Sequence, residues 1–211
     1  MKLNKVMALA LSGLMAVSML AGCSNGTPNG EENNEGQVVV DDVASVMNTA
    51  QGKIKFETSP EQSALLTAAM GEAKYANANV TTIGLAGTTN PVYNYLQKNM
   101  LGKDGLTTGS PKFTPVKGES NSVTLLYVYP AKNITDDYAL IEIAKNLVNT
   151  QLSTELKNVV AIGNDKFNAT YTGEVSLAKL TKSDGDGANT KEAYYVLVTV
   201  TQNVGDTAIA A

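Results

Sequence analysis

Two aspartates near the C-terminal end are spaced like oxygen ligands for a hard cation. Asp184 and Asp186 alternate with glycine in the run Ser183-Asp-Gly-Asp-Gly-Ala-Asn189. Such alternation forms the first half of a calcium-binding loop, but Glu192 comes too early to be its bidentate glutamate. Glycine, aspartate and asparagine are equally typical of a hairpin turn. The segment is interpreted as a turn, with weak calcium binding through Asp184 and Asp186 as the alternative.

Asp136 and Asp137 are adjacent carboxylates of the kind used for acid–base chemistry in glycoside hydrolysis. They follow Thr135 at the predicted start of a helix, where acidic groups stabilise the positive end of the helix dipole. Adjacent helical residues point in different directions, so helix capping explains the pair better than catalysis does. Tyrosines could stack on sugars, although half-buried sheet positions also favour them. The nine tyrosines include three close pairs: Tyr93/Tyr95, Tyr127/Tyr129 and Tyr194/Tyr195.

Ser176-Leu-Ala-Lys179 resembles the S-x-x-K motif of penicillin-binding proteins and class A β-lactamases. That chemistry places the serine at the start of a helix, with the lysine one turn later. Here the segment alternates like a strand, which predicts that Ser176 and Lys179 point to opposite faces of a sheet. The companion S-D-N and K-T-G elements are absent from the sequence. The match is interpreted as a coincidence.

The side chains that the chain lacks exclude several classes of function. It has no His, Trp or Arg, a single Cys and a net charge of −4. Serine–histidine triads, cysteine–histidine pairs and zinc sites built on His or Cys are therefore excluded. The mildly acidic sequence has no basic patch for nucleic acid. We expect no cofactor and no enzymatic activity.

The single cysteine follows a short apolar segment at the N-terminus. Lys2 and Lys5 precede a mostly apolar stretch from Val6 to Met19, which is the pattern of an export signal. Leu20-Ala21-Gly22-Cys23 resembles the lipobox of bacterial lipoproteins at every position. The resemblance implies cleavage between Gly22 and Cys23 and attachment of lipid to Cys23. The alternative is an uncleaved membrane anchor, for which the apolar stretch is short.

The lipobox predicts where the protein resides. Residues 1–22 would be the signal peptide, and residues 23–36, which lack apolar side chains after Cys23, would form a disordered tether. The lipid would hold the protein on a bacterial membrane, facing outside the cytoplasm. In a host with two membranes, Ser24 does not resemble the aspartate retention signal, which favours the outer membrane.

Hydrophobic periodicity predicts helices and strands from about residue 37 onward. Ser59 is expected to cap a helix with Gln62 completing a capping box, and Asn90 and Thr135 to begin two others. The third of these helices is predicted to bury Tyr138, Ile141, Ala144, Val148 and Leu152. The other predicted elements are a helix over 39–51 and strands over 53–57, 80–85, 123–129, 159–162, 167–171, 175–180 and 192–202.

These elements predict an α+β fold, with an antiparallel sheet in the C-terminal half packed by amphipathic helices. Residues 37–205 would form one globular domain, with a possible subdivision within 102–121 and a tail over 206–211. The leading functional hypothesis is a lipid-anchored extracytoplasmic binding or scaffolding protein whose partner is an envelope protein or a glycan. The alternatives are a glycan-directed hydrolase that uses carboxylates alone and an accessory subunit of a membrane complex.

Overall fold

A computed structural model describes residues 37–39, 43–72, 84–99, 105–132, 134–183 and 190–209. All of them belong to one compact unit that spans Glu35–Ala211. The lipobox, the tether over 23–36 and the calcium candidates Asp184 and Asp186 lie outside the described residues. The elements in chain order are β1 (Gln37–Val39), α2 (Val43–Ala50), β2 (Lys55–Thr58), α3 (Pro60–Glu72), β3 (Gly84–Leu85), α4 (Pro91–Asn99), β4 (Ser120–Pro130), α5 (Asp136–Asn146), η1 (Leu147–Gln151), β5 (Val159–Ile162), β6 (Asp165–Ser183) and β7 (Thr190–Ala208).

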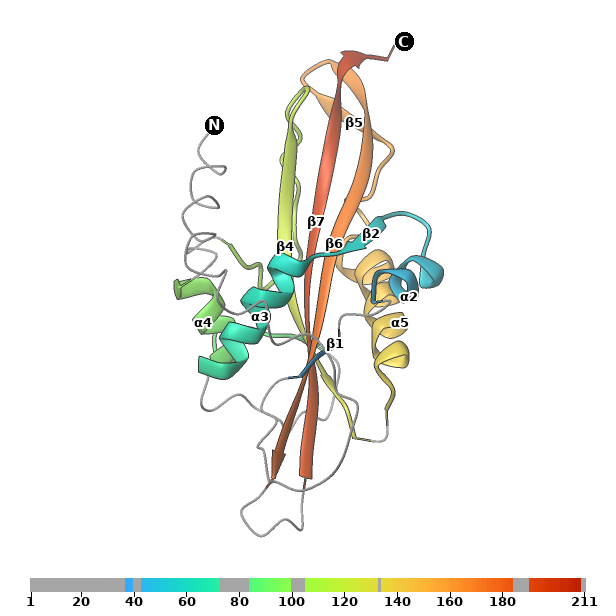
Figure 1. Cartoon of the computed structure of the whole chain (residues 1–211). Coiled ribbons are helices and arrows are strands. Elements are labelled where there is room, and N and C mark those ends of the chain that lie inside the picture. Colours follow the sequence, from blue (N-terminus) through green and yellow to red (C-terminus); the bar gives the residue numbers. More distant parts are fainter. Residues whose placement is uncertain are drawn as a thin grey trace. The chain divides into compact units, whose positions relative to one another are not determined.

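The described strands form one mixed sheet that is largely antiparallel. Its central order is β1-β6-β7-β4-β3, and β2 and β5 also pair with β6. Only the β2–β6 pair is parallel among those described. The long β6–β7 hairpin runs through the sheet, with helices on both of its faces (Figure 1). The predicted α+β class, with the sheet mainly in the C-terminal half, is confirmed.

Alternate residues of the central strands enter two separate hydrophobic clusters, because successive side chains of a strand point to opposite faces. The α5-side cluster packs α2, α5 and η1 against one face and includes Tyr127, Val175, Val196 and Val198. The α3-side cluster packs α3 and α4 against the other face and includes Leu126, Ala178, Tyr195 and Leu197. Both faces of the hairpin are therefore buried where helices cover them.

The segment before β4 contributes to both clusters. Leu106 lies in the α3-side cluster and Phe113 in the α5-side cluster. The backbone N–H of Thr107 donates to the carbonyl of Thr124 in β4 at 2.8 Å. Residues 105–119 therefore pass around the β4 edge of the sheet.

Three helix starts follow the predicted capping chemistry. Ser59, Asn90 and Thr135 accept backbone N–H groups of the first turns of α3, α4 and α5 through their side-chain oxygens. The predicted capping box at α3 is wrong. The Ser59 N–H donates to the carbonyl of Val175, and the amide of Gln62 contacts Glu174 and Thr199 on the sheet instead.

The predicted inner face of α5 is partly wrong. Tyr138 is 52 % exposed and Ile141 is half-buried, whereas Ala139, Leu140, Ile143 and Ala144 are buried. The π-helical turn η1 follows, in which the Leu152 N–H donates to the carbonyl of Leu147 at 2.8 Å. This wider turn inserts one residue, so Val148 and Leu152 rejoin the buried face.

Other boundaries differ from the predicted ones. The strands predicted over 167–171 and 175–180 are one 19-residue strand, β6. Strand β7 continues to Ala208, so residues 206–208 belong to the sheet and not to a tail. Helix α2 begins only at Val43, and Val39 ends β1. The strand predicted over 159–162 is confirmed as β5.

Candidate functional site

An open cleft among the described residues lies at the outer edge of β6. Strand β5 pairs with β6 as far as Asn168, and β2 pairs with it only from Thr172 onward. Residues 169–171 are therefore left between these two edge strands and form the floor of a cleft. Its volume is about 660 Å³, within the range of small-molecule sites.

The first wall of the cleft is the turn between α2 and β2, which Gln51 holds together. Its side-chain oxygen accepts the backbone N–H groups of Lys53 and Ile54 at 2.8 and 2.9 Å. Its amide nitrogen donates to the carbonyl of Ile54 at 2.7 Å. These three bonds fix the backbone that presents Lys53 to the cleft.

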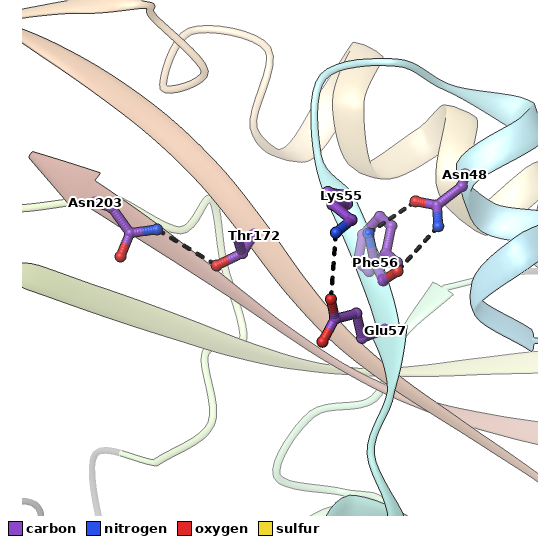
Figure 2. A network of polar contacts seen from close by, with 6 residues as sticks. All are labelled: Asn48, Lys55, Phe56, Glu57, Thr172 and Asn203. Atoms are coloured by element: carbon purple, nitrogen blue, oxygen red, sulfur yellow. Dashed lines mark hydrogen bonds and ion pairs between the residues drawn. The ribbon is translucent and has the colours of Figure 1, made fainter.

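Asn48 fixes the same wall from α2. Its side-chain oxygen accepts the Phe56 N–H at 2.7 Å, and its amide nitrogen donates to the Phe56 carbonyl at 2.9 Å, as Figure 2 shows. The amide of Asn48 thereby supplies both bonds that a neighbouring strand would make to this residue of β2. The wall is anchored to helix and sheet together.

The second wall is the segment before β5, which Tyr171 holds. The Tyr171 hydroxyl accepts the Lys157 N–H at 3.0 Å and lies 2.7 Å from the Glu155 carbonyl. It also accepts the side-chain amide of Gln202 at 3.0 Å. Apart from the exposed bond from the Lys53 N–H to Gln51, the hydrogen bonds that hold the two walls are buried or half-buried, so the walls are fixed without a ligand.

The two charged residues that line the cleft are both lysines. Lys53 and Lys55 stand on the first wall, and the exposed polar residues Asn158, Asn168 and Thr170 also line the cleft. No acidic residue lines the cavity in the described part of the chain. Lys55 forms an ion pair with Glu57 at 3.5 Å, and both side chains are largely exposed (Figure 2).

A hydroxyl-rich sheet face adjoins the cleft. Its side chains come from even-numbered positions of β4 and β6 and from odd-numbered positions of β7. They lie near the end of the sheet that α3 does not cover. Cross-strand contacts connect Ser122 with Thr201, Thr124 with Thr199, and Asn203 with both Ser120 and Thr172. Figure 2 shows the Asn203–Thr172 contact beside β2.

The structure confirms that Ser176 and Lys179 point to opposite faces. Ser176 is 1 % exposed on the α3 side, where its hydroxyl lies 3.2 Å from the Ser59 carbonyl and 3.1 Å from the Ser63 hydroxyl. On the other face, the Lys179 ammonium lies 3.0 Å from Glu192 and over the ring of Tyr194. The S-x-x-K arrangement is therefore not formed.

The remaining sequence candidates are distributed over the fold. Asp136 and Asp137 occupy the first turn of α5 behind its Thr135 cap. Tyr138 is the exposed tyrosine of that turn, and its ring meets Tyr129 edge-on at 6.5 Å. Burial raises the pKa of Tyr127 well above its ordinary value. These groups lie outside the cleft lining.

The structure adds two findings on metals and membranes, both limited to the described residues. No group of three or more acidic side chains is placed to hold a metal ion. None of the helices has both the length and the apolar character needed to cross a bilayer.

Sequence reasoning missed the cleft altogether. Its walls come from residues 48–55 and 158–171, which are far apart in the chain and carry no motif. The sequence offered one hint of the cleft, which is the group of two side-chain amides and two lysines over residues 48–55. Only the β2–β6 pairing brings these residues near Asn168 and Thr170. Comparison with known protein families, curated proteins and solved structures finds no match to this chain.

Proposed function

We propose that this chain is a lipid-anchored binding protein of the bacterial envelope that acts outside the cytoplasm without catalysis. The observation that carries the proposal is the sequence Leu20-Ala21-Gly22-Cys23 after a charged and then apolar N-terminus. A lipid on Cys23 would tether the unit Glu35–Ala211 to the membrane through the polar segment that follows.

Two features of the globular part support binding over catalysis. The exported sequence contains no His and no Arg, and Cys23 would be consumed by lipid. The preformed cleft at β6 presents amides, hydroxyls and two lysines, which are groups that recognise a ligand by hydrogen bonds and charge. A tethered protein can use even a weak site, because the tether raises its effective concentration at the membrane.

Labelling of cells with radioactive palmitate tests the anchor. The wild-type chain should incorporate label and fractionate with membranes, and Cys23→Ser should lose both. Ser24→Ala is the matched control, because it changes the neighbouring residue and leaves the lipobox intact. Unchanged labelling and fractionation of Cys23→Ser would overturn the proposal.

A further inference from the structure

We propose that the β6 cleft binds an acidic carbohydrate-like ligand, in which an oxyanion is attached to a hydroxyl-rich scaffold. The inference rests on the proposed binding function and adds the class of ligand. It follows from the charge, the uncommitted polar groups and the rigidity of the cleft.

The oxyanion is expected at the lysine wall. Lys53 and Lys55 are the charged residues of the lining, and within the described part of the chain the Lys53 ammonium makes no ion pair. The Lys55–Glu57 pair is solvent-exposed, and such pairs contribute little. An incoming carboxylate or phosphate can therefore bind both ammonium groups with little loss.

The neutral groups of the cleft fall into two sets. Asn48 and Gln51 bond to the backbone and fix the shape of the first wall. Asn158, Asn168 and Thr170 are the exposed neutral polar residues of the lining. Side-chain amides and hydroxyls both donate and accept, so these three residues suit the hydroxyl groups of a sugar or polyol.

The floor and the fixed walls complete the site. Ala169 and Tyr171 line the cleft but are buried in the α5-side cluster, so they give it a fixed base. A site whose walls are held before the ligand arrives loses less entropy on binding. The cleft volume is about 660 Å³, which leaves room for a ligand larger than a single ion.

The binding experiment uses the full chain in a neutral detergent and measures Kd by titration calorimetry. The probes are trigalacturonate, a neutral galactose trisaccharide and glycerol phosphate, and they distinguish a carboxylated from a phosphorylated ligand. We expect one of the two anions to bind at least fivefold more tightly than the neutral sugar, and added salt to weaken binding by screening. The proposal would be overturned if neither trigalacturonate nor glycerol phosphate bound more tightly than the neutral sugar.

Variants locate the site. Lys53→Gln with Lys55→Gln should weaken anion binding by about fivefold or more, because two exposed charge contacts are lost. Asn168→Ala with Thr170→Val should weaken it as well. The control, Lys98→Gln with Lys112→Gln, removes the same charge from exposed positions outside the cleft lining and should leave Kd within about twofold.

The remaining outcomes separate this inference from the proposed function. Thermal melts of each variant show whether it is folded, and a folded lysine double variant that binds like wild type would overturn the cleft assignment. The double variant Thr172→Val with Thr201→Val tests the hydroxyl-rich face. If this variant lost binding while the lysine double variant bound normally, the ligand would bind on that face, and the cleft assignment would be overturned. Cys23→Ser should bind with the wild-type Kd, so failure of lipid attachment and failure of ligand binding are recorded independently.

Discussion

The ring of Phe56 in β2 lies directly on Gly173 in β6, its register partner in the parallel pair. A Cβ atom placed on Gly173 would lie 2.4 Å from both Cδ1 and Cε1 of the ring and 3.0 Å from Cγ2 of Ile54. Only glycine leaves the space that the ring fills. This contact seats the first wall of the cleft on the sheet.

We expect Gly173→Ala to destabilise the protein by about 1–3 kcal/mol, the usual cost of overpacking a filled core. The free energy of unfolding, measured in urea, checks this. Gly109→Ala is the control, because no atom lies within 4 Å of its added Cβ. Phe56→Leu in the Gly173→Ala background should recover part of the loss, and equal stability of Gly173→Ala and wild type would contradict the packing.

Asn48 should stabilise the edge of β2 through both halves of its amide. Asn48→Asp keeps the acceptor for the Phe56 N–H but places a carboxylate against the Phe56 carbonyl, where an amide donor stood. We expect a loss of about 1–3 kcal/mol at pH 7, the penalty for an unmatched polar contact. Urea unfolding measures it, with the exposed Asn149→Ala as the comparison. A loss no larger than that of Asn149→Ala would rule out this role.

Stability should fall at alkaline pH because buried tyrosines resist ionisation. Burial raises the pKa of Tyr127 in the folded chain, whereas tyrosine in the unfolded chain ionises near its ordinary value of about 10. The contribution is therefore complete below about pH 10 and is lost as pH rises from there toward the folded pKa. Burial also raises the pKa of Tyr93, Tyr129 and Tyr194, which adds to the effect.

Tyr127→Phe removes the largest of these contributions. Between about pH 10 and 11, we expect the variant to lose roughly 1 kcal/mol less stability than wild type, since one pKa unit corresponds to about 1.4 kcal/mol. Urea unfolding at a series of pH values gives the two slopes. Identical slopes for Tyr127→Phe and wild type would refute the assignment.

Ser176 is expected to be structural. Ser176→Ala removes contacts to Ser59 and Ser63 under α3 and should cost about 1 kcal/mol. Incubation with benzylpenicillin should add no mass to the wild-type chain, because Lys179 points to the other face. Intact-mass spectrometry checks this, and an adduct on Ser176 would show that the S-x-x-K motif is active.

Local signals predicted much of the fold because they act over a few residues. Ser59, Asn90 and Thr135 begin helices as their side-chain chemistry requires, and the apolar run over 159–162 forms β5. The alternation around Ser176 also predicted the opposite orientation of Lys179. In each case the deciding interaction lies within the segment itself.

The errors arose where distant segments decide. The sequence Thr172-Gly173-Glu174 suggests a break between two strands, but β7 pairs across it and Phe56 fills the space above the glycine. Gln62 fits a capping box, yet Glu174 and Thr199 provide its contacts from the sheet. Tyr138 was predicted to be buried because it shares a regular helical face with Val148 and Leu152. The π turn after Asn146 inserts one residue between them, so Tyr138 lies on the exposed side. The cleft escaped prediction for the same reason, because it exists only once β2 and β5 are paired with β6.

The pairing of β6 with β7, each 19 residues long, also has a consequence for how the chain reaches its native state. Its alternate residues enter two different cores, so a slip of one residue would exchange the side chains intended for each core and spoil both at once. Misaligned pairings should therefore be short-lived. The third central strand, β4, joins β7 across some 75 residues of intervening chain, as at Thr124 and Thr199, and closure over such a separation is slow. Because β6 and β7 contribute to both cores, loss of their pairing should disrupt the two cores together.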